Sequence, residues 1–481
     1  MGLLEVLGRK GGPGRDRVAL RTRSGTVSRG ELWALASRLA GRLKEAGVEE
    51  GARVALLAPN SPSLVAGFFA PAFLGAAVVP LDARLTAPEV AACLEHAGAA
   101  ALLCHPGLVP LAREAVSLVP SAPIPVLSAK DEPGPVAAEP AGASGPALYC
   151  YTSGSTGRPK AVELDHAALT QGPANFAATV GLGPADRVLA AIPLSHSYGF
   201  AACLLPALVV GAEAVLLERP GPGVLLSALV EGGVTYFPGV PFWFDALLRC
   251  YRPRRVRLSP AIRCLSAGSP LDPAVAEAFE REFGAFVGQE YGTSETGPIS
   301  ADLGPSPGRR GSVGLPLAGV SVRVVDAQGR DLPPGSVGEV AVKTSSMACR
   351  YFRPSGREAG RFSRGWFFTG DRGRMDAQGY LYLEGRRDRA INLDGLKVDP
   401  DEVERVLLGF PGVAEAVVVE GRVGRRSVLR AVLAPRGRAG PEAVRAFCQE
   451  RLAPWKVPEL VEFRDRLPRS PLGKVALDRL L

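Results

Sequence analysis

The sequence predicts an α/β protein with more than one domain. Its 481 residues are 47% hydrophobic, and the chain is longer than the ~250–300 residues at which a single hydrophobic core stops growing. From about residue 53, short apolar runs alternate with helical segments, which is typical of parallel strands covered by helices on both faces. After Gly311 the pattern changes to antiparallel strands and turns, and near Gly385 it changes again.

We therefore predict a large N-terminal domain over residues 1–385 and a small α+β domain over residues 386–481. The large domain combines parallel-rich sheets, layered with helices, with a small antiparallel barrel-like part. Its expected strands lie at 54–57, 77–79, 101–104, 148–151, 188–192, 214–217, 234–237, 262–265, 285–290, 320–325 and 338–343. Its expected helices lie at 62–74, 87–97, 200–208, 224–231, 242–251 and 273–283. The small domain has expected strands at 414–419 and 428–433 and helices at 400–408 and 441–451.

Loops at 152–160, 266–270 and 291–295 leave the carboxyl ends of expected strands, where parallel sheets bind ligands. The first loop, with the tyrosine before it, reads YTSGSTGRPK. Glycines allow the backbone N–H groups to turn toward an anion, the hydroxyls add donors, and Lys160 adds a positive charge. The spacing is not the GxxxxGK[ST] of a Walker-type loop. By itself, a loop of this composition is more often a solvated turn before a helix.

Composition and charge exclude several classes of protein. The 56 Lys and Arg exceed the 48 Asp and Glu by eight, but no zinc finger, helix-turn-helix or basic-aromatic repeat accompanies the arginine clusters at 252–257 and 422–426. The eight cysteines form no CxxC pair, and the four histidines have no metal-ligand spacing. Prolines and a glycine divide the uncharged run 61–81, and the N-terminus lacks a secretory signal. We predict a soluble cytoplasmic monomer or homodimer, with no nucleic-acid or membrane partner.

An ordered set of motifs resembles the adenylate-forming superfamily, which comprises acyl- and aryl-CoA synthetases, adenylation domains of peptide synthetases and firefly-type luciferases. After YTSGSTGRPK come PLSHSYGF (193–200), SAGSPL (266–271), QEYGTSET (289–296), GWFFTGD (365–371), GRRDRAINLDGLKVDPDEVE (385–404) and LPRSPLGK (467–474). Each motif alone is weak, but the complete order covers most of residues 150–475 and is very specific.

The resemblance implies a ligase that works in two steps with ATP, Mg²⁺ and coenzyme A. A carboxylate first attacks the α-phosphorus of ATP, giving an acyl-adenylate and pyrophosphate. A thiol then attacks the acyl carbon, and AMP leaves. Because the first step brings two anions together, positioning and positive charge must supply most of the catalysis.

The resemblance also assigns roles to individual residues. Glu295 matches the carboxylate that binds Mg²⁺, and Ser294 stands where the family usually has threonine as the hydroxyl beside the α-phosphate. Asp371 and Arg386 match the residues that bind the ribose. The complete nucleotide-binding set is Thr152, Ser153, Gly154, Ser155, Thr156, Gly157, Lys160, Ala267, Gly268, Ser269, Pro270, Glu290, Tyr291, Gly292, Thr293, Asp371 and Arg386.

Further matches concern catalysis and movement. Lys474 matches the lysine that bridges the carboxylate and ATP during adenylation, and His196 matches a residue near the nucleotide that gates the thiol tunnel. Asp388 matches the hinge about which the small domain rotates after adenylation, and Gly395 belongs to the face used in the thiol step. Asn392 departs from the family, in which many members have lysine.

Each assignment has a structural alternative. Asp371 is also suited to cap the turn beside Gly370, and Lys474 to lie solvated in a C-terminal loop. His196 is also explained as a core histidine with satisfied hydrogen bonds.

The acid is expected to bind in a pocket formed by Tyr198, Ala202, Val240, Phe242, Gly268 and Thr293, with Trp243 nearby. Glu290 stands where many family members have glycine, and a longer side chain there would shorten or polarise the acyl tunnel. With the neighbouring aromatic residues, this favours a compact aryl acid such as a benzoate, hydroxybenzoate or aminobenzoate. An aminobenzoate gains a partner if Glu290 faces inward; the equally weighted alternative is that Glu290 points away and pairs with an arginine.

Free CoA is the expected thiol because no carrier segment is found in the chain. The alternatives are the phosphopantetheine arm of a separate carrier protein as acceptor, or a medium-chain fatty acid as substrate. A non-catalytic nucleotide sensor is a more distant alternative, since it predicts loss of Lys474, Glu295 or Asp371, and all are present.

Overall fold

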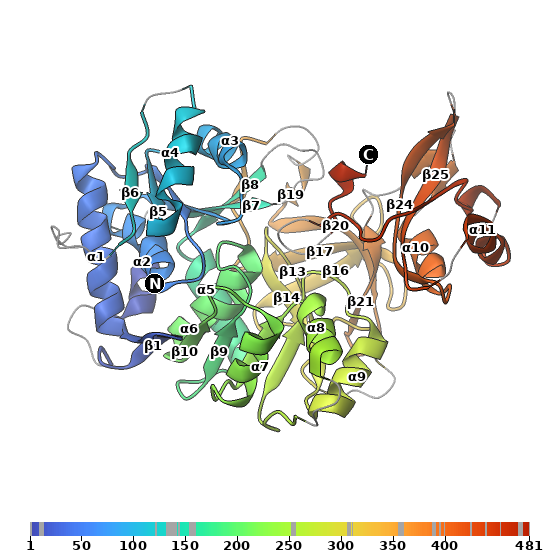
Figure 1. Ribbon diagram of the computed structural model, residues 1–481, viewed down its shortest axis with the longest axis horizontal. Coiled ribbons are helices and arrows are strands. Elements are labelled where there is room, and N and C mark those ends of the chain that lie inside the picture. The colour runs from blue at the N-terminus through green and yellow to red at the C-terminus, as the bar shows by residue number, and fades with distance from the viewer. Residues whose placement is uncertain are drawn as a thin grey trace. The chain divides into compact units, whose positions relative to one another are not determined.

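The computed structural model describes residues 2–8, 14–120, 123–130, 142, 145–152, 160–251, 256–304, 309, 311–354, 360–386, 391–393, 396–398, 400–423, 426–437, 440–452, 454–469 and 475–480 (Figure 1). These residues form two compact units. The first contains residues up to 152, 160–322 and 342–367, and the second contains 323–341 and 368–480. The expected domain boundary at 385 stays a prediction.

One sheet of the first unit is mostly parallel and is buried on both faces. Its order is β18 (Arg350–Phe352), β8 (Lys160–Asp165), β7 (Pro146–Thr152), β4 (Ala77–Leu81), β3 (Arg53–Leu57), β5 (Ala101–Cys104) and β6 (Val126–Ser128). The pairs β7–β8 and β8–β18 are antiparallel, and the other pairs of this sheet are parallel. Val54 packs into one hydrophobic core and Ala55 into another, because alternate residues of a strand face opposite sides of the sheet. This double burial explains the unbroken apolar runs in the sequence.

A second sheet of the first unit has nine strands. Its order is β15 (Leu315–Pro316), β14 (Gly297–Ala301), β13 (Val287–Thr293), β12 (Arg263–Ser266), β11 (Tyr236–Gly239), β9 (Arg187–Ala190), β10 (Glu213–Leu216), β1 (Val18–Thr22) and β2 (Gly25–Ser28). The strands from β13 to β1 are parallel. Val188 and Leu189 again contribute to different cores, so this sheet is also covered on both faces.

Helices in the crossover connections cover these sheets (Figure 1). The α-helices of the first unit are α1 (Arg29–Glu45), α2 (Pro62–Phe69), α3 (Ala87–Ala97), α4 (Val109–Ser117), α5 (Ala168–Val180), α6 (Leu205–Val210), α7 (Pro222–Val230), α8 (Pro241–Tyr251) and α9 (Pro273–Phe283). Shorter helical segments are η1 (Leu3–Leu7), η2 (Ala70–Leu74), η3 (Pro106–Leu108) and the π-helix η4 (Gly199–Leu204).

Most of a five-stranded antiparallel sheet belongs to the second unit. Its path is β16 (Val320–Val325), β17 (Gly338–Thr344), β20 (Trp366–Met375) and β19 (Phe362–Ser363), and β21 (Leu381–Arg386) pairs with β20. Farther along, β24 (Val413–Val423), β25 (Arg426–Pro435) and β26 (Leu460–Phe463) form a sheet whose core includes α10 (Pro400–Leu408) and α11 (Pro441–Gln449). The remaining elements are the pair β22 (Ile391–Leu393) and β23 (Leu396–Val398), with η8 (Pro454–Lys456) and η9 (Leu477–Arg479).

The predicted α/β architecture is confirmed, and the expected elements are found with ends shifted by a few residues. The helix expected at 62–74 leaves the α-conformation after Phe69, because Pro71 has no backbone N–H to donate within a helix. The 291–295 segment is not all loop: β13 continues to Thr293 because Tyr291 and Thr293 pair with β14. The sequence analysis missed α1, although its Ser28–Glu31 capping box is a recognisable signal.

The uncharged run 61–81 is split among α2, η2 and β4. Within the described ranges, no helix has the length and apolar character needed to cross a membrane.

Gly199, at the start of η4, has no space for a side chain. A Cβ atom there would lie 2.2 Å from the carbonyl oxygen of Pro193 and 2.9 Å from the Cα atom of Leu194. Gly199→Ala should therefore displace the loop before η4 and lower the free energy of unfolding by about 1–3 kcal/mol. Urea denaturation measures this change. Gly304→Ala is the matched control, because nothing lies within 4 Å of its Cβ position; equal stability of the two variants would contradict the prediction.

Candidate active site

Polar side chains follow the carboxyl ends of parallel strands in both sheets of the first unit. Asn60 and Asp82 follow β3 and β4, whereas His196 and Ser294 follow β9 and β13. Because parallel strands bring their carboxyl ends to one edge of a sheet, this is where a ligand site is expected.

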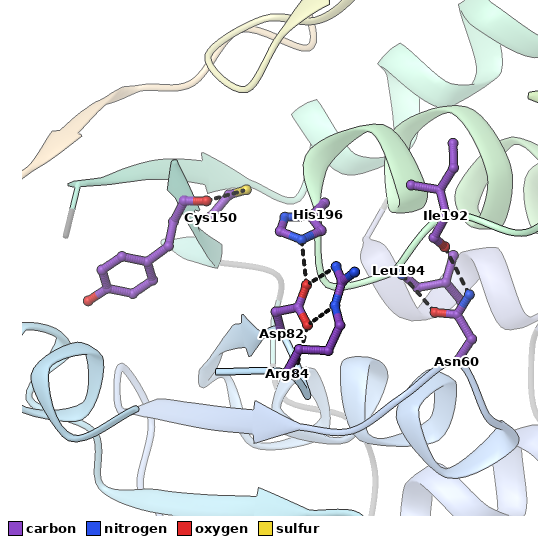
Figure 2. A network of polar contacts seen from close by, with 8 residues as sticks. Asn60, Asp82, Arg84, Cys150, Ile192, Leu194 and His196 are labelled. Carbon is purple, nitrogen blue, oxygen red and sulfur yellow. Dashed lines mark hydrogen bonds and ion pairs between the residues drawn. The ribbon is translucent and has the colours of Figure 1, made fainter. Parts of the chain in front are cut away.

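A hydrogen bond between an imidazole and a carboxylate connects the two edges. His196 Nε2 lies 2.8 Å from Asp82 Oδ2, and Arg84 donates to both oxygens of the same carboxylate, at 2.9 and 2.6 Å (Figure 2). Burial would raise the pKa of Asp82, but the hydrogen bonds from Arg84 and His196 outweigh it and hold that pKa well below its ordinary value. Since an ionised carboxylate only accepts hydrogen bonds, His196 Nε2 carries the hydrogen. The orientation of the imidazole is therefore fixed by Asp82, which follows a strand of the other sheet.

Asn60 holds the loop that leads to His196. Its buried amide nitrogen donates to the carbonyl oxygens of Ala190 and Ile192, at 3.0 and 2.9 Å. Its oxygen accepts from the Leu194 N–H at 2.8 Å, and Figure 2 shows the bonds to Ile192 and Leu194. One side chain thus satisfies three backbone groups of an irregular segment, which would be costly to bury unpaired.

Ser294 and Glu295 lie at the end of β13 and are held from two directions. The hydroxyls of Ser294 and Ser197 are 3.0 Å apart, and the Tyr351 hydroxyl donates to Glu295 Oε1 at 2.6 Å. The thiol of Cys150, on β7, lies close to this group: burial, together with the negative charge of Glu295, raises its pKa to about 12. Cys150 therefore stays protonated and is not a nucleophile.

The donor set at Glu295 suits Mg²⁺. Where the chain is described, no group of three or more His, Cys, Asp or Glu side chains forms a metal cluster. A single carboxylate fits a hard cation that takes its other ligands from phosphate oxygens and water. Glu295 would hold such an ion through its carboxylate, oriented by Tyr351.

The hydroxyl-rich loop is described only at its base. The backbones of Thr152 and Lys160 are paired where β7 meets β8, so the two residues mark the two ends of the loop. Tyr151 instead anchors the hairpin, because its hydroxyl donates to the Cys93 carbonyl oxygen at 3.1 Å and lies 2.9 Å from His96 Nδ1. The predicted residues that lie outside the described part of the chain are Ser153, Gly154, Ser155, Thr156, Gly157, Asp388, Gly395 and Lys474.

Two expected nucleotide-binding segments, 267–270 and 291–293, lie at the ends of neighbouring strands. Ala267 to Pro270 follow β12, and Gly268 adopts φ +88°, a conformation that favours glycine. Tyr291 is buried within β13, beside Gly292. The Thr293 hydroxyl lies 3.0 Å from that of Thr296 and accepts from its N–H at 3.2 Å, so Thr293 also closes the β13–β14 turn.

Asp371 and Arg386 lie on adjacent strands of the second unit. They are direct cross-strand neighbours on β20 and β21, as a shared role at one ribose requires. The Asp371 N–H donates to the Thr369 hydroxyl at 3.0 Å, which fixes the backbone at this position.

The expected acyl-pocket residues differ in their surroundings. Ala202 is fully buried, and Tyr198 and Val240 pack against the same core. Phe242 is 58% exposed on α8 and packs on Trp243, so its pocket role has no support from burial. Glu290 is buried and hydrogen-bonds to Tyr198. The alternative that Glu290 pairs with an arginine is wrong for the described residues, since none forms an ion pair with it.

The sequence analysis missed Asp82, Asn60, Ser197 and Tyr351. Asp82 directly follows a buried strand and Asn60 lies three residues beyond one, so the strand-end rule would have found both. Tyr351 carries no such signal, because β18 lies 56 residues from Glu295 and reaches it only through the fold.

The geometry defines a class of protein, an α/β enzyme that binds an anionic nucleotide at the carboxyl ends of parallel strands. The family profile of AMP-binding enzymes matches residues 10–352, and that of the AMP-binding enzyme C-terminal domain matches residues 402–474. The chain belongs to the AMP-binding enzyme family.

Curated relatives match along nearly the whole chain. A feruloyl-CoA synthase from an Amycolatopsis species is 34% identical over 470 residues, covering 95% of this chain and 94% of the relative. An indoleacetate–CoA ligase from Aromatoleum aromaticum is 34% identical over 499 residues, covering 99% and 97%. The fatty acid–[acyl-carrier-protein] ligase ScoC from Streptomyces coeruleorubidus is 31% identical over 481 residues, covering 94% and 90%.

Solved structures agree with this assignment. The o-succinylbenzoate CoA synthetase of Bacillus subtilis, in complex with ATP and magnesium, is 29% identical with a TM-score of 0.86, covering 99% of this chain and 98% of that one. The anthranilate CoA ligase AuaEII, in complex with anthranoyl-AMP, is 26% identical with a TM-score of 0.85, covering 100% and 96%. The chain is an AMP-forming acid–thiol ligase, and this class uses ATP, Mg²⁺ and coenzyme A.

Asp82→Asn should disturb catalysis more than stability. The substitution keeps the shape of the side chain but removes the charge that holds His196, and a hydrogen bond to a charged group contributes about 1.5–3 kcal/mol. We expect kcat/KM for AMP formation to fall by roughly 10- to 100-fold with an unchanged circular dichroism spectrum.

The matched control for Asp82→Asn is Asp245→Asn, which breaks an exposed ion pair with Arg249 on α8. If kcat/KM for AMP formation were the same in the two variants, the contact with Asp82 would not be what sets the position of His196.

Proposed function

We propose that this chain joins a compact aryl carboxylic acid to coenzyme A through an acyl-adenylate. The observation that carries the proposal is the convergence of His196, Ser294 and Glu295 on the carboxyl ends of the parallel strands, together with the pairing of Thr152 and Lys160 at the end of β7. This arrangement concentrates hydroxyls, a positive charge and one cation-binding carboxylate where a triphosphate would bind.

In the first step, an oxygen of the acid bonds to the α-phosphorus of ATP and the bond to pyrophosphate breaks. Bound Mg²⁺ supplies positive charge to the phosphate oxygens. Glu295, oriented by Tyr351, holds the cation, and Ser294, positioned by Ser197, donates its hydroxyl to an α-phosphate oxygen. Thr152 and Lys160 hold the pyrophosphate end. Lys474 bridges the acid and the nucleotide.

In the second step, the thiol sulfur of CoA bonds to the acyl carbon, the bond to AMP breaks, and the thiol proton passes to solvent. His196 acts as the gate at the thiol tunnel. Its contact with Asp82 holds the imidazole in one position, and breaking this contact would let the imidazole turn toward the acid. The small domain at 386–481 turns about Asp388 and presents the face that contains Gly395. Asp371 and Arg386 hold the ribose through both steps.

A compact aryl acid is favoured over a fatty acid because Glu290 is buried and contacts Tyr198, which is one of the expected acyl-pocket residues. A long apolar chain would have to bury its methylenes against this carboxyl. The relatives named for ferulic, indoleacetic and anthranilic acids support the same class.

A carrier protein is the second candidate acceptor, and the similarity to ScoC favours it. Incubation of enzyme, ATP and acid with either free CoA or a holo carrier protein distinguishes the two by the mass of the thioester. We also propose a cytoplasmic location, which the eight cysteines support, since all of them lie in the described residues as free thiols.

Lys474→Ala should abolish adenylation while leaving thioester formation from a supplied acyl-adenylate intact, because only the first step needs charge between two anions. Pyrophosphate release measures the first step and thioester formation measures the second. Lys456→Ala is the control, since that lysine pairs with Glu402 in the second unit. Survival of both half-reactions in Lys474→Ala would contradict its assigned role.

A panel of carboxylic acids tests the substrate class. AMP formation in the presence of ATP, Mg²⁺ and CoA should be at least roughly tenfold more efficient, in kcat/KM, with substituted benzoates than with octanoate, since a pocket shaped for a ring loses 1–3 kcal/mol with a poorly matched chain. Faster turnover of medium-chain fatty acids would overturn the aryl proposal. Absence of AMP formation with every acid would overturn the ligase proposal as well.

A further inference from the structure

A buried carboxyl group with incomplete hydrogen bonding contacts Tyr198, one of the residues expected to form the acyl pocket. Glu290, on β13, is 5% exposed, and its Oε2 atom finds no hydrogen-bond partner among the described residues. The Tyr236 hydroxyl, on β11, is likewise buried and unpartnered within the described chain. Unpaired buried polar atoms are rare in native proteins and cost about 1–3 kcal/mol each. Two of them in one region indicate that a ligand group supplies the missing hydrogen bonds.

The position of Glu290 connects these atoms to the reaction site. Tyr198, which hydrogen-bonds to Glu290, directly follows Ser197, whose hydroxyl lies 3.0 Å from that of Ser294. Because two adjacent residues contact Glu290 and Ser294, an aromatic acid whose carboxylate lies near Ser294 would place its ring beside Tyr198 and Glu290.

Tyr198 connects Glu290 to the accessible edge. Its hydroxyl hydrogen-bonds to the Glu290 carboxylate and lies 3.5 Å from the Leu265 carbonyl oxygen. Tyr198 is only part-buried and follows His196 by two residues, so its ring extends from the polar edge toward the buried carboxyl. An acid that enters along this ring reaches Glu290 after side-chain adjustments of the kind common on binding.

Burial also determines the charge of Glu290. Desolvation raises its pKa to about 8, only partly opposed by the hydrogen bond from Tyr198. The groups that face this carboxyl are Tyr198 and Cys203 near η4 and Tyr236 on β11, and all have pKa values raised well above their ordinary range. Arg263 on β12 acts on Tyr236. At neutral pH the site is therefore mostly uncharged and polar.

We propose that Glu290, with Tyr198 and Tyr236, selects acids whose ring carries a neutral hydrogen-bond donor, either a hydroxyl or an aromatic amino group. This inference rests on the proposed function. An apolar substituent leaves the buried oxygens unpaired, and sites built to hydrogen-bond a substrate group reject analogues that lack it. An alkylammonium group fits less well, because its binding requires Glu290 to ionise in a buried environment.

The test compares matched ring substituents. The acids are 3- and 4-hydroxybenzoate, 3- and 4-aminobenzoate, the corresponding methylbenzoates, and 4-(aminomethyl)benzoate as the ammonium arm. The readout is kcat/KM for AMP formation with CoA. The wild-type protein should prefer a hydroxyl or amino substituent over methyl at the same position by roughly 10- to 100-fold, as expected for one unpaired buried polar group. The kcat/KM values of the hydroxybenzoates and aminobenzoates then show which of the two donors the site prefers.

Variants assign the preference to Glu290. Glu290→Leu should reduce the donor-to-methyl ratio to near one, whereas Glu290→Gln, which keeps an acceptor oxygen, should retain most of it. Glu114→Gln, on the exposed face of α4, is the matched control and should keep the wild-type ratio. An unchanged ratio in Glu290→Leu would overturn the inference, as would equal use of methyl and donor acids by the wild type. Preference for the ammonium arm would overturn the neutral-donor assignment.

A second measurement tests the burial of Glu290 through protein stability and needs no activity assay. Because the pKa of Glu290 is higher in the folded than in the unfolded chain, the folded state binds the extra proton, and its stability should fall as pH rises from about 4.5 to about 8. The thermal midpoint of the wild-type protein should fall over this pH range, and the thermal midpoint of Glu290→Gln should not show this fall. Identical pH profiles would mean that Glu290 is not buried as described and would overturn the inference. If aryl acids are activated without donor preference, only this inference fails; if no aryl acid is activated, the proposed function fails with it.

Discussion

The hydrogen bond between His196 and Asp82 is the interaction on which the active edge depends. It joins the loop after β9 of one sheet to the strand end of β4 in the other, and Asn60 secures the same loop through three backbone hydrogen bonds. Neither sheet alone fixes this segment, because it has no regular structure between β9 and η4. Polar contacts between two well-packed cores therefore set the position of His196, for which we propose a role beside the nucleotide.

Two buried carboxyl groups of the first unit, those of Asp82 and Glu290, differ in charge. Asp82 is kept ionised because Arg84 and His196 compensate for its burial, whereas Glu290 lacks such partners and is kept mostly protonated. Glu295 accepts a hydrogen bond from the Tyr351 hydroxyl on one of its oxygens. The three carboxyl groups thus suit different partners: an imidazole, a neutral substrate group and a divalent cation.

Much of the fold followed from local pattern. Alternating apolar runs and helical segments predicted the parallel strands, because strands buried on both faces must be apolar at every position. The β13–β14 hairpin was harder to predict, since Tyr291 and Thr293 continue the strand only through pairing with Ser300 and Gly297. In the site, Asp82 carried a readable signal at a strand end. Tyr351 did not, because its contact with Glu295 spans 56 residues of chain.

The sequence by itself determined the family and the type of reaction, because a full set of short motifs in a fixed order is specific even though each member is weak. It also identified Glu290 as a departure from that family, but not its surroundings. Only the tertiary structure decided that this carboxyl faces inward, beside two tyrosines and away from any described arginine ion pair. The physical reason is that burial and hydrogen-bond partners are properties of packed neighbours from distant strands, which no local pattern contains.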